Sequence, residues 1–200
     1  PTRDRPEDFN AAAQSVKDTS DADVVGYVDD DQRDLYASPE APVFFGPRIW
    51  PVAAANRLVE LNPGYAAYGL ITDDSKIITP GWDAWLLDVV SQFPNRICVV
   101  SPHHNLGNHV DMPFVTKEWI EATGWYAYPT CQHYAWPIIT GLIGEMTAIV
   151  HAPLGSFSIE HLPKTELTRL NTLERDHTAF FEFVSLELPR TVETVRQAMS

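Results

Sequence analysis

Two neighbouring carboxylates, Asp73 and Asp74, follow an apolar run at residues 65–71. The run predicts a strand that is covered on both faces of a parallel sheet. Ligands of open parallel sheets bind beyond the carboxyl ends of the strands, and paired carboxylates there can hold a divalent cation that also binds phosphate. The spacing therefore predicts a metal–diphosphate site. The same Asp-Asp-Ser run also fits an ordinary turn, in which aspartate side chains bond to backbone amides.

Further charged residues lie near the start of the sequence. The opening PTRDRP carries Arg3 and Arg5 and has the character of a loop that follows a strand, so we expect a strand ahead of Pro1. The short β run at residues 22–28 ends in three successive aspartates. Strand ends of a parallel sheet share one edge, so these basic and acidic groups should line one crevice. Arginines in such a crevice bind phosphates, and an aspartate binds a ribose or a base edge.

The first half of the chain alternates strands and helices, which is typical of a parallel α/β sheet. We predict helices at residues 6–19, 49–61 and 79–93 and strands at 22–28, 65–71 and 96–100, with Thr79 as the N-cap of the third helix, Pro80 in its first turn and a loop at 31–47. The second half is less regular, with predicted helices at residues 116–123, 136–146, 172–188 and 192–199 and short strands at 147–150 and 158–162. The length fits one domain, residues 1–200.

The composition is that of a globular protein, with 44% hydrophobic and 20% charged residues. A net charge of −13 argues against a broad electrostatic grip on nucleic acid. Cys98 and Cys131 provide no disulfide framework, and Cys98 lies in an apolar run that predicts a core thiol. No signal peptide and no apolar run of about 18 residues is present, so we expect a cytoplasmic protein without a membrane partner.

Taken together, the motifs resemble those of GT-A glycosyltransferases, which have a Rossmann-like fold. The resemblance is strongest to compact enzymes encoded by bacteriophages, some of which add sugars to modified DNA bases. The motifs, spread over residues 1–183, are PTRDRP, VDDD, GLITDDSKIITPGWD, GWY, HYAW and EHLP. The resemblance implies a nucleotide-sugar-binding half at residues 1–100 and an acceptor-binding half at residues 101–200. If the protein is phage-encoded, it would act in the host cytoplasm.

The resemblance also implies roles for individual residues. In the opening loop, Thr2, Arg3 and Arg5 would contact the nucleotide. Asp30, after the first β run, would meet the uracil or ribose. Asn56 would face the donor from its helix, and Asp73 of the DxD-like element would hold the ribose. Because Thr72 replaces the first Asp of the DxD motif, the metal, Mn²⁺ or Mg²⁺, falls to Asp74 and His161. A neutral imidazole suits Mn²⁺ better than Mg²⁺. A surface role for Asn56 and a structural role for His161 stay open.

The implied reaction moves a sugar from a UDP-sugar to a hydroxyl acceptor, and the acceptor would be a modified base in phage DNA. The metal would stabilise the leaving diphosphate, and an inverting enzyme needs a carboxylate base. In one position the sequence departs from the family, because Trp136 stands where relatives carry that base. Asp111 is our first candidate for the base, with His133 and Glu145 as alternatives. A retaining mechanism, or loss of activity, would also fit.

Several other readings stay open. The acceptor could be a protein, a polysaccharide or a small molecule, or the chain could bind nucleotides without transferring sugar. A nucleotidyltransferase is disfavoured, because no lysine- or glycine-rich loop, Walker motif or G-x-G-x-x-G is present. The histidines of residues 101–111 lack zinc-site spacing. We assign most aromatic residues of 125–136 and the Phe-rich C-terminal helix to the core, with a monomer or homodimer as the expected state.

Overall fold

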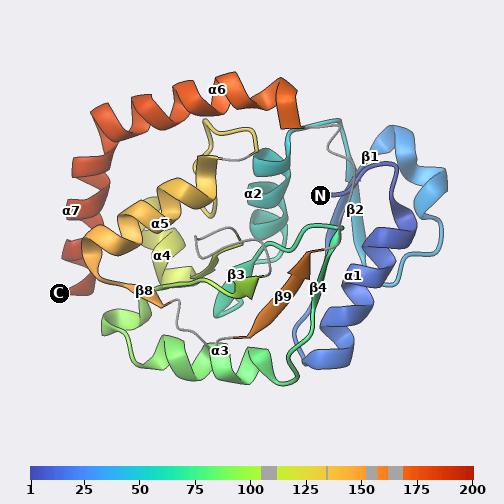
Figure 1. The fold of residues 1–200 in the computed structure, drawn as a ribbon, viewed down its shortest axis with the longest axis horizontal. Helices are drawn as coiled ribbons and strands as arrows, with labels where there is room; N and C mark the ends of the chain where they lie inside the picture. Colours follow the sequence, from blue (N-terminus) through green and yellow to red (C-terminus); the bar gives the residue numbers. More distant parts are fainter. Residues whose placement is uncertain (105–111, 134, 152–156, 162–168) are drawn as a thin grey trace.

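The computed structural model describes residues 1–104, 112–133, 135–151, 157–161 and 169–200. Its helices surround small β-sheets near the centre of the molecule (Figure 1). The helices are α1 (Pro6–Thr19), α2 (Pro51–Leu61), α3 (Trp82–Ser91), α4 (Lys117–Thr123), α5 (Ala135–Thr147), α6 (Arg169–Glu182) and α7 (Leu188–Met199). Shorter helical segments are η1 (Asp30–Tyr36), η2 (Pro94–Arg96) and the π-helical η3 (Phe183–Glu187). Within the described residues, no helix has both the length and the apolar character needed to cross a bilayer.

The strands form small sheets of mixed direction. One sheet pairs β1 (Gly26–Asp29) with β2 (Val43–Gly46) in parallel. A second has the order β3 (Ala67–Gly69), β7 (Phe114–Thr116), β5 (Val99–Val100) and β8 (Val150–His151). The third has the order β4 (Ser75–Ile77), β9 (Ser158–His161) and β6 (His103–His104).

The predicted α/β class is confirmed, but the mostly parallel sheet is not. β7 runs antiparallel to both of its neighbours, β3 and β5, and β4 runs antiparallel to β9. Parallel neighbours need a long crossover connection, usually a helix. Antiparallel pairing instead lets distant segments enter the same sheet from the opposite direction, a pairing that the alternation of elements in the sequence does not reveal.

The apolar run at residues 65–71 also differs from its prediction. Only Ala67–Gly69 is paired as a strand, and it lies at the end of its sheet rather than in the middle. The prediction of coverage on both faces is wrong for this structure, because Tyr65 is 42% exposed and Tyr68, Leu70 and Ile71 are only half-buried.

Two predicted boundaries need correction. Helix α3 begins at Trp82 after Gly81, whose φ of 71° lies in the left-handed region that favours glycine. Thr79 does not cap this helix, because its hydroxyl accepts the N–H of Ser158 at 2.9 Å. Pairing of β4 with β9 keeps the preceding chain extended, and the helix therefore starts later. The predicted loop at residues 31–47 contains most of η1 and all of β2.

The core of the second half is aromatic, as predicted. Tyr126 and Trp136 are 3% exposed, and their ring centroids lie 5.4 Å apart. Tyr128 packs edge-on against the fully buried Phe183 at 4.7 Å. Helices α6 and α7 curve around this core in Figure 1, and Phe183 and Phe180 pack against it, but the core assignment is wrong for Phe181, which is 65% exposed.

Both cysteines are buried, which confirms the core interpretation of Cys98. Burial raises the pKa of each thiol to about 12, because the charged thiolate loses its hydration. Cys98 and Cys131 are therefore inert thiols at neutral pH.

Candidate functional site

The opening segment lies along the edge of β1. The N–H of Thr2 donates to the carbonyl of Tyr27 at 3.0 Å, and Thr2 forms a parallel bridge with Val28. The Thr2 hydroxyl donates to Asp73 Oδ2 at 2.8 Å and shares a hydrogen bond of 2.8 Å with the hydroxyl of Tyr36. Thr2 thus connects the end of β1 with the acids that follow β3.

Arg3 binds the aspartates at the end of β1. Its Nη1 donates to Asp29 Oδ2 at 2.6 Å, and its two terminal nitrogens each donate to one oxygen of Asp31 at 2.8 Å. The hydrogen bonds with Asp31 and Asp29 raise the pKa of Arg3, and the bond from Arg3 lowers the pKa of Asp31. This two-pronged geometry matches the guanidinium to a carboxylate, and a phosphate has the same complementarity.

Arg5 faces the two acids after β3. Its Nη1 lies 3.2 Å from Asp73 Oδ1 and 4.0 Å from Asp74 Oδ2. The backbone there does form a turn, in which the N–H of Ser75 donates to the carbonyl of Thr72 at 3.0 Å. Yet the Asp73 carboxylate accepts hydrogen bonds from the side chains of Arg5 and Thr2. The turn and the site are therefore compatible, since the turn presents the carboxylates to the opening loop.

These residues form what we call the acid–arginine cluster: Asp29, Asp31, Asp73, Asp74, Arg3 and Arg5. Its carboxylates outnumber its guanidiniums by two, and the carboxylates of Asp73 and Asp74 are only 12% and 16% exposed. Carboxylate oxygens are the ligands that hard divalent cations prefer, and Mg²⁺ sites often use one or two carboxylates with substrate phosphates. Within the described residues, no group of three or more His, Cys, Asp or Glu side chains could hold a metal. Asp73 and Asp74 could supply the one or two carboxylates of such a site.

Not every predicted site residue joins this cluster. Asp30 is exposed and pairs with Arg33 at 2.8 Å. The side-chain oxygen of Asn56 accepts the N–H groups of Tyr126 and Ala127 at 3.2 and 3.0 Å, and its nitrogen donates to the carbonyl of Ala127 at 2.7 Å. In this structure Asn56 therefore connects α2 to the backbone of residues 126–127.

Sequence reasoning expected the three aspartates at 29–31 in the crevice but gave the binding role to Asp30 rather than to Asp29 and Asp31, and it missed Tyr36. Strand alternation would not have selected the two acids, because β1 ends at Asp29 and Asp31 belongs to η1. For two other predicted residues the structure describes no side chain. Asp111 is outside the described residues. His161 ends β9, where its backbone pairs with that of Ser75, while its side chain is outside what the structure describes.

A buried carboxylate organises the chain just before α5. Asp176 on α6 is 1% exposed and accepts the backbone N–H groups of Gln132, His133 and Ala135 at 2.7, 2.9 and 3.3 Å. Burial lowers the pKa of His133, while the charges of Asp176 and Asp74 oppose that shift. His133 is thus near enough to Asp74 to feel its field, and its imidazole is neutral at neutral pH.

Comparison with known proteins gives one informative match. No protein-family model and no curated protein matches the sequence. The mannosyltransferase PcManGT from Pyrobaculum calidifontis, solved in complex with GDP-Man and Mn²⁺, superimposes with a TM-score of 0.61 at 10% sequence identity. The match covers 99% of this chain and 72% of that one. The chain has a glycosyltransferase fold. At this identity the likeness establishes the fold alone.

Within this glycosyltransferase fold, His133 should make stability depend on pH. Its folded pKa lies below the ordinary value of 6.5, so below that value the unfolded chain binds a proton that the folded chain resists. The contribution of the neutral His133 imidazole to folding stability is therefore complete above about pH 6.5, and it decreases as the pH falls. We expect the free energy of unfolding, measured in urea between about pH 5 and 7, to fall less steeply toward acid in His133→Gln than in the wild type. Parallel curves for the two proteins would contradict the assignment.

The Tyr36 hydroxyl should contribute measurably to stability. It bonds to the Thr2 hydroxyl and accepts the N–H of Arg5 at 3.2 Å, and Tyr36 is only 3% exposed. We expect Tyr36→Phe to lower the free energy of unfolding by about 1–2 kcal/mol, because the part-buried N–H of Arg5 and the Thr2 hydroxyl both lose their partner. Tyr65→Phe is the control, since its hydroxyl bonds to Asp23 on the surface and its loss should cost less than about 0.5 kcal/mol. Equal losses in urea unfolding would contradict this account.

Proposed function

We propose that the protein is a metal-dependent glycosyltransferase that moves a sugar from a nucleotide-sugar to a hydroxyl acceptor. The supporting observation is the acid–arginine cluster, in which the opening loop joins the end of β1 to Asp73 and Asp74. The cluster combines guanidiniums that suit a diphosphate with carboxylates that suit a cation. The glycosyltransferase fold makes this combination meaningful, because PcManGT was solved with GDP-Man and Mn²⁺.

In this proposal Asp74 is the principal metal ligand and Asp73 helps to hold the ribose. The ladder between β4 and β9 supports His161 as a further ligand, since its backbone partner Ser75 directly follows Asp74. The bound cation, Mn²⁺ or Mg²⁺, would stabilise the negative charge that develops on the leaving diphosphate. Thr2, Arg3 and Arg5 would contact the nucleotide, and Arg5 would exchange part of its pairing with Asp73 for the phosphates.

The remaining requirement is a base for the acceptor hydroxyl. In an inverting transfer the acceptor oxygen bonds to the anomeric carbon, the bond to the diphosphate oxygen breaks, and a base takes the hydroxyl proton. We keep Asp111 as the proposed base. His133 is the alternative that the described residues support, because its lowered pKa keeps it neutral and able to accept a proton. Glu145 has less support, since it is exposed on α5.

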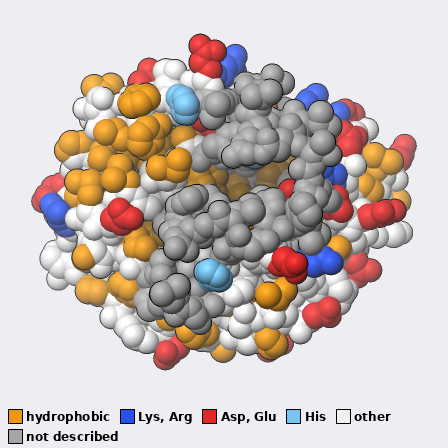
Figure 2. Space-filling view, viewed as in Figure 1, with side chains coloured by type: hydrophobic (Ala, Val, Ile, Leu, Met, Phe, Trp, Pro, Cys, Tyr) orange, Lys and Arg blue, Asp and Glu red, His pale blue; other side chains and the backbone are white. Residues whose placement is uncertain are grey.

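The donor and the acceptor are proposals of different strength. We propose a UDP-sugar as donor, with GDP-mannose as the first competitor to test because PcManGT was solved with that ligand. Asp30 and Asn56 stay proposed donor contacts that would have to change partners. For the acceptor, a modified DNA base has little support. The net charge is −13, and in Figure 2 the basic side chains on the face shown are scattered among acidic ones. A protein, a polysaccharide and a small molecule are equally suitable as candidate acceptors.

One observation favours a second function, nucleotide binding without transfer. Trp136 occupies the position where the resembling enzymes carry their base, and it is 3% exposed and packed on Tyr126. A buried indole cannot accept a proton. Under this alternative the cluster would still bind a nucleotide with a metal, but no sugar would be released.

A donor screen separates the two functions. The protein is incubated with Mn²⁺ and each of a set of UDP-, GDP-, dTDP- and CMP-sugars, and released nucleotide is measured with and without an acceptor mixture. We expect slow release from one donor without acceptor and faster release with the correct acceptor. Binding of a nucleotide-sugar without release from any donor would support the second function, and failure of every nucleotide-sugar to bind would refute both.

A further inference from the structure

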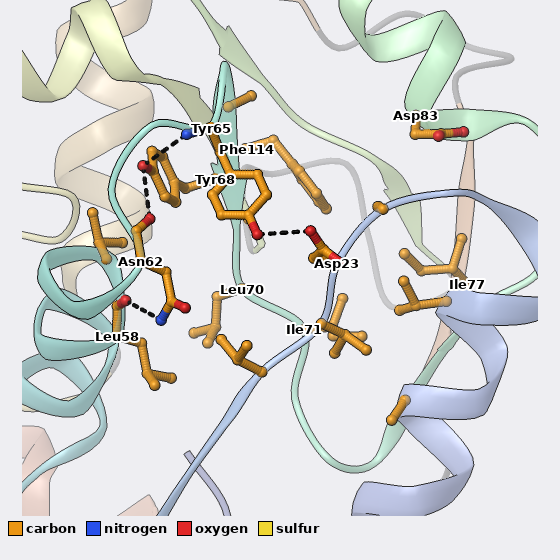
Figure 3. A pocket seen from close by; sticks show the side chains of 18 of the residues that line it. Asp23, Leu58, Asn62, Tyr65, Tyr68, Leu70, Ile71, Ile77, Asp83 and Phe114 are labelled. Carbon is orange, nitrogen blue, oxygen red and sulfur yellow. Dashed lines mark hydrogen bonds between the residues drawn. The ribbon is translucent and has the colours of Figure 1, made fainter. Parts of the chain in front are cut away.

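An apolar cavity of about 380 Å³ lies between residues 21–26 and residues 65–71, and Asp73 of the acid–arginine cluster is part of its lining. Figure 3 shows side chains from both segments lining it, with the Tyr65 hydroxyl bonded to Asp23 across one end. Helices α1, α2 and α3 contribute further apolar side chains to the wall. Representative lining residues are Val16, Leu58, Leu70, Ile71, Leu86 and Phe114.

One long wall of the cavity is a strand edge that belongs to β1. The N–H of Gly26 donates to Pro42 at 2.9 Å, so the backbone groups of Gly26 face β2. Backbone groups alternate between the two sides of a strand, and those of Val25 and Tyr27 therefore face away from β2. Thr2 uses this second edge when it donates to the carbonyl of Tyr27.

The opposite wall is the outer edge of β3. The carbonyl of Ala66 accepts the N–H of Lys117 on the β7 side at 3.1 Å. By the same alternation, the backbone groups of Ala67 and Gly69 face the cavity. Among the described residues, β3 is also the terminal strand of its sheet. Two strand edges thus border one apolar space, although proteins generally cover or blunt such edges.

We propose that this cavity is a slot for one more β-strand, formed by an extended apolar segment that runs directly into Pro1 in the same chain. The strand would lie parallel to β1 and β3 and would join their two sheets into one. We call the cavity the strand slot.

The direction and connection follow from Thr2. Its parallel bridge with Val28 is already the last pair of such a strand, and its side chain reaches Asp73 just beyond β3. A segment that precedes Thr2 therefore extends back along both edges, and Pro1 itself lines the cavity. The apolar sequence of residues 65–71 is then explained, because the added strand would cover the side that is now half-exposed.

Other occupants fit less well. A lipid-like ligand would fill the apolar space but leave both rows of backbone groups unpaired. A strand from a second copy would have to stop where Thr2 already occupies the edge of β1.

Two fusions test the proposal. One carries Lys-Val-Val-Ile-Ile-Val directly before Pro1, and the matched control carries Lys-Val-Pro-Ile-Pro-Val, because proline removes backbone donors. Against the 200-residue chain, we expect the first fusion to melt at least about 5 °C higher and the control to show no gain. Hydrogen exchange of the Tyr27 and Gly69 amides should slow at least about tenfold in the first fusion alone.

Three results would overturn the strand slot. They are equal melting temperatures for the two fusions, unprotected Tyr27 and Gly69 amides in the first fusion, and failure of that fusion to fold. A fourth result would come from sedimentation, which measures whether the 200-residue chain dimerises. If it does, and the Tyr27 and Gly69 amides are protected in that dimer, the strand slot belongs to a second copy. None of these readouts depends on glycosyl transfer, so the strand slot and the proposed function can fail separately.

Discussion

Replacing Asp74 by asparagine should reduce nucleotide release from the preferred sugar donor by about 10²–10³-fold or more. In our proposal this carboxylate holds the cation that stabilises the leaving diphosphate, and electrostatic contributions of that kind are large in a site shielded from water. Asparagine keeps the shape of the side chain but removes the charge. The loss should therefore appear in metal-dependent binding and in turnover together.

The fold should tolerate this substitution. Asp74 lies 4.0 Å from the Arg5 guanidinium, a distance at which a partly exposed pair contributes little to stability, and Arg5 keeps Asp73 as a closer partner. Asp34→Asn is the matched control, because Asp34 is an exposed acid of η1 outside the cluster. Full activity in Asp74→Asn, or an equal loss in Asp34→Asn, would contradict the metal assignment.

Asp176→Ala should have the largest effect on stability, with a loss of about 3–5 kcal/mol in the free energy of unfolding. The substitution removes a carboxylate that is 1% exposed and accepts three backbone N–H groups at the start of α5. Those donors, two of them part-buried and one buried, would be left without their acceptor. Domains are stable by only about 5–15 kcal/mol, so this is a large fraction of the total.

Urea unfolding at 25 °C measures this effect, with Glu174→Ala as the control on the exposed face of the same helix. The control should remain within about 0.5 kcal/mol of the wild type. A loss below about 1 kcal/mol in Asp176→Ala would show that the carboxylate does not hold the segment before α5.

The sequence predicted those features that depend on local chemistry. The bounds of α1 agree with the prediction, because Pro6 suits a helix start and the stripe of Phe9, Ala12, Ala13 and Val16 is buried. The approach of Arg3 and Arg5 to the acids was also foreseeable, since loops that follow parallel strands share an edge.

Other features depend on residues that are distant in the sequence. The amide of Asn56 is satisfied by Tyr126 and Ala127, about 70 residues away, and no local pattern reveals that pairing. The choice between Asp29 and Asp30 depends on where β1 ends and η1 begins. The late start of α3 depends on pairing between β4 and β9. In each case tertiary contacts override local preference.

The most direct test of the central claim is a calorimetric titration of the protein with UDP and with GDP, in the presence of Mn²⁺ and again with excess EDTA. The account predicts binding of one nucleotide per chain when Mn²⁺ is present, and loss of that binding in EDTA and in Asp74→Asn. Binding of equal affinity in EDTA, or binding that Asp74→Asn retains in full, would contradict a metal–diphosphate site at the acid–arginine cluster.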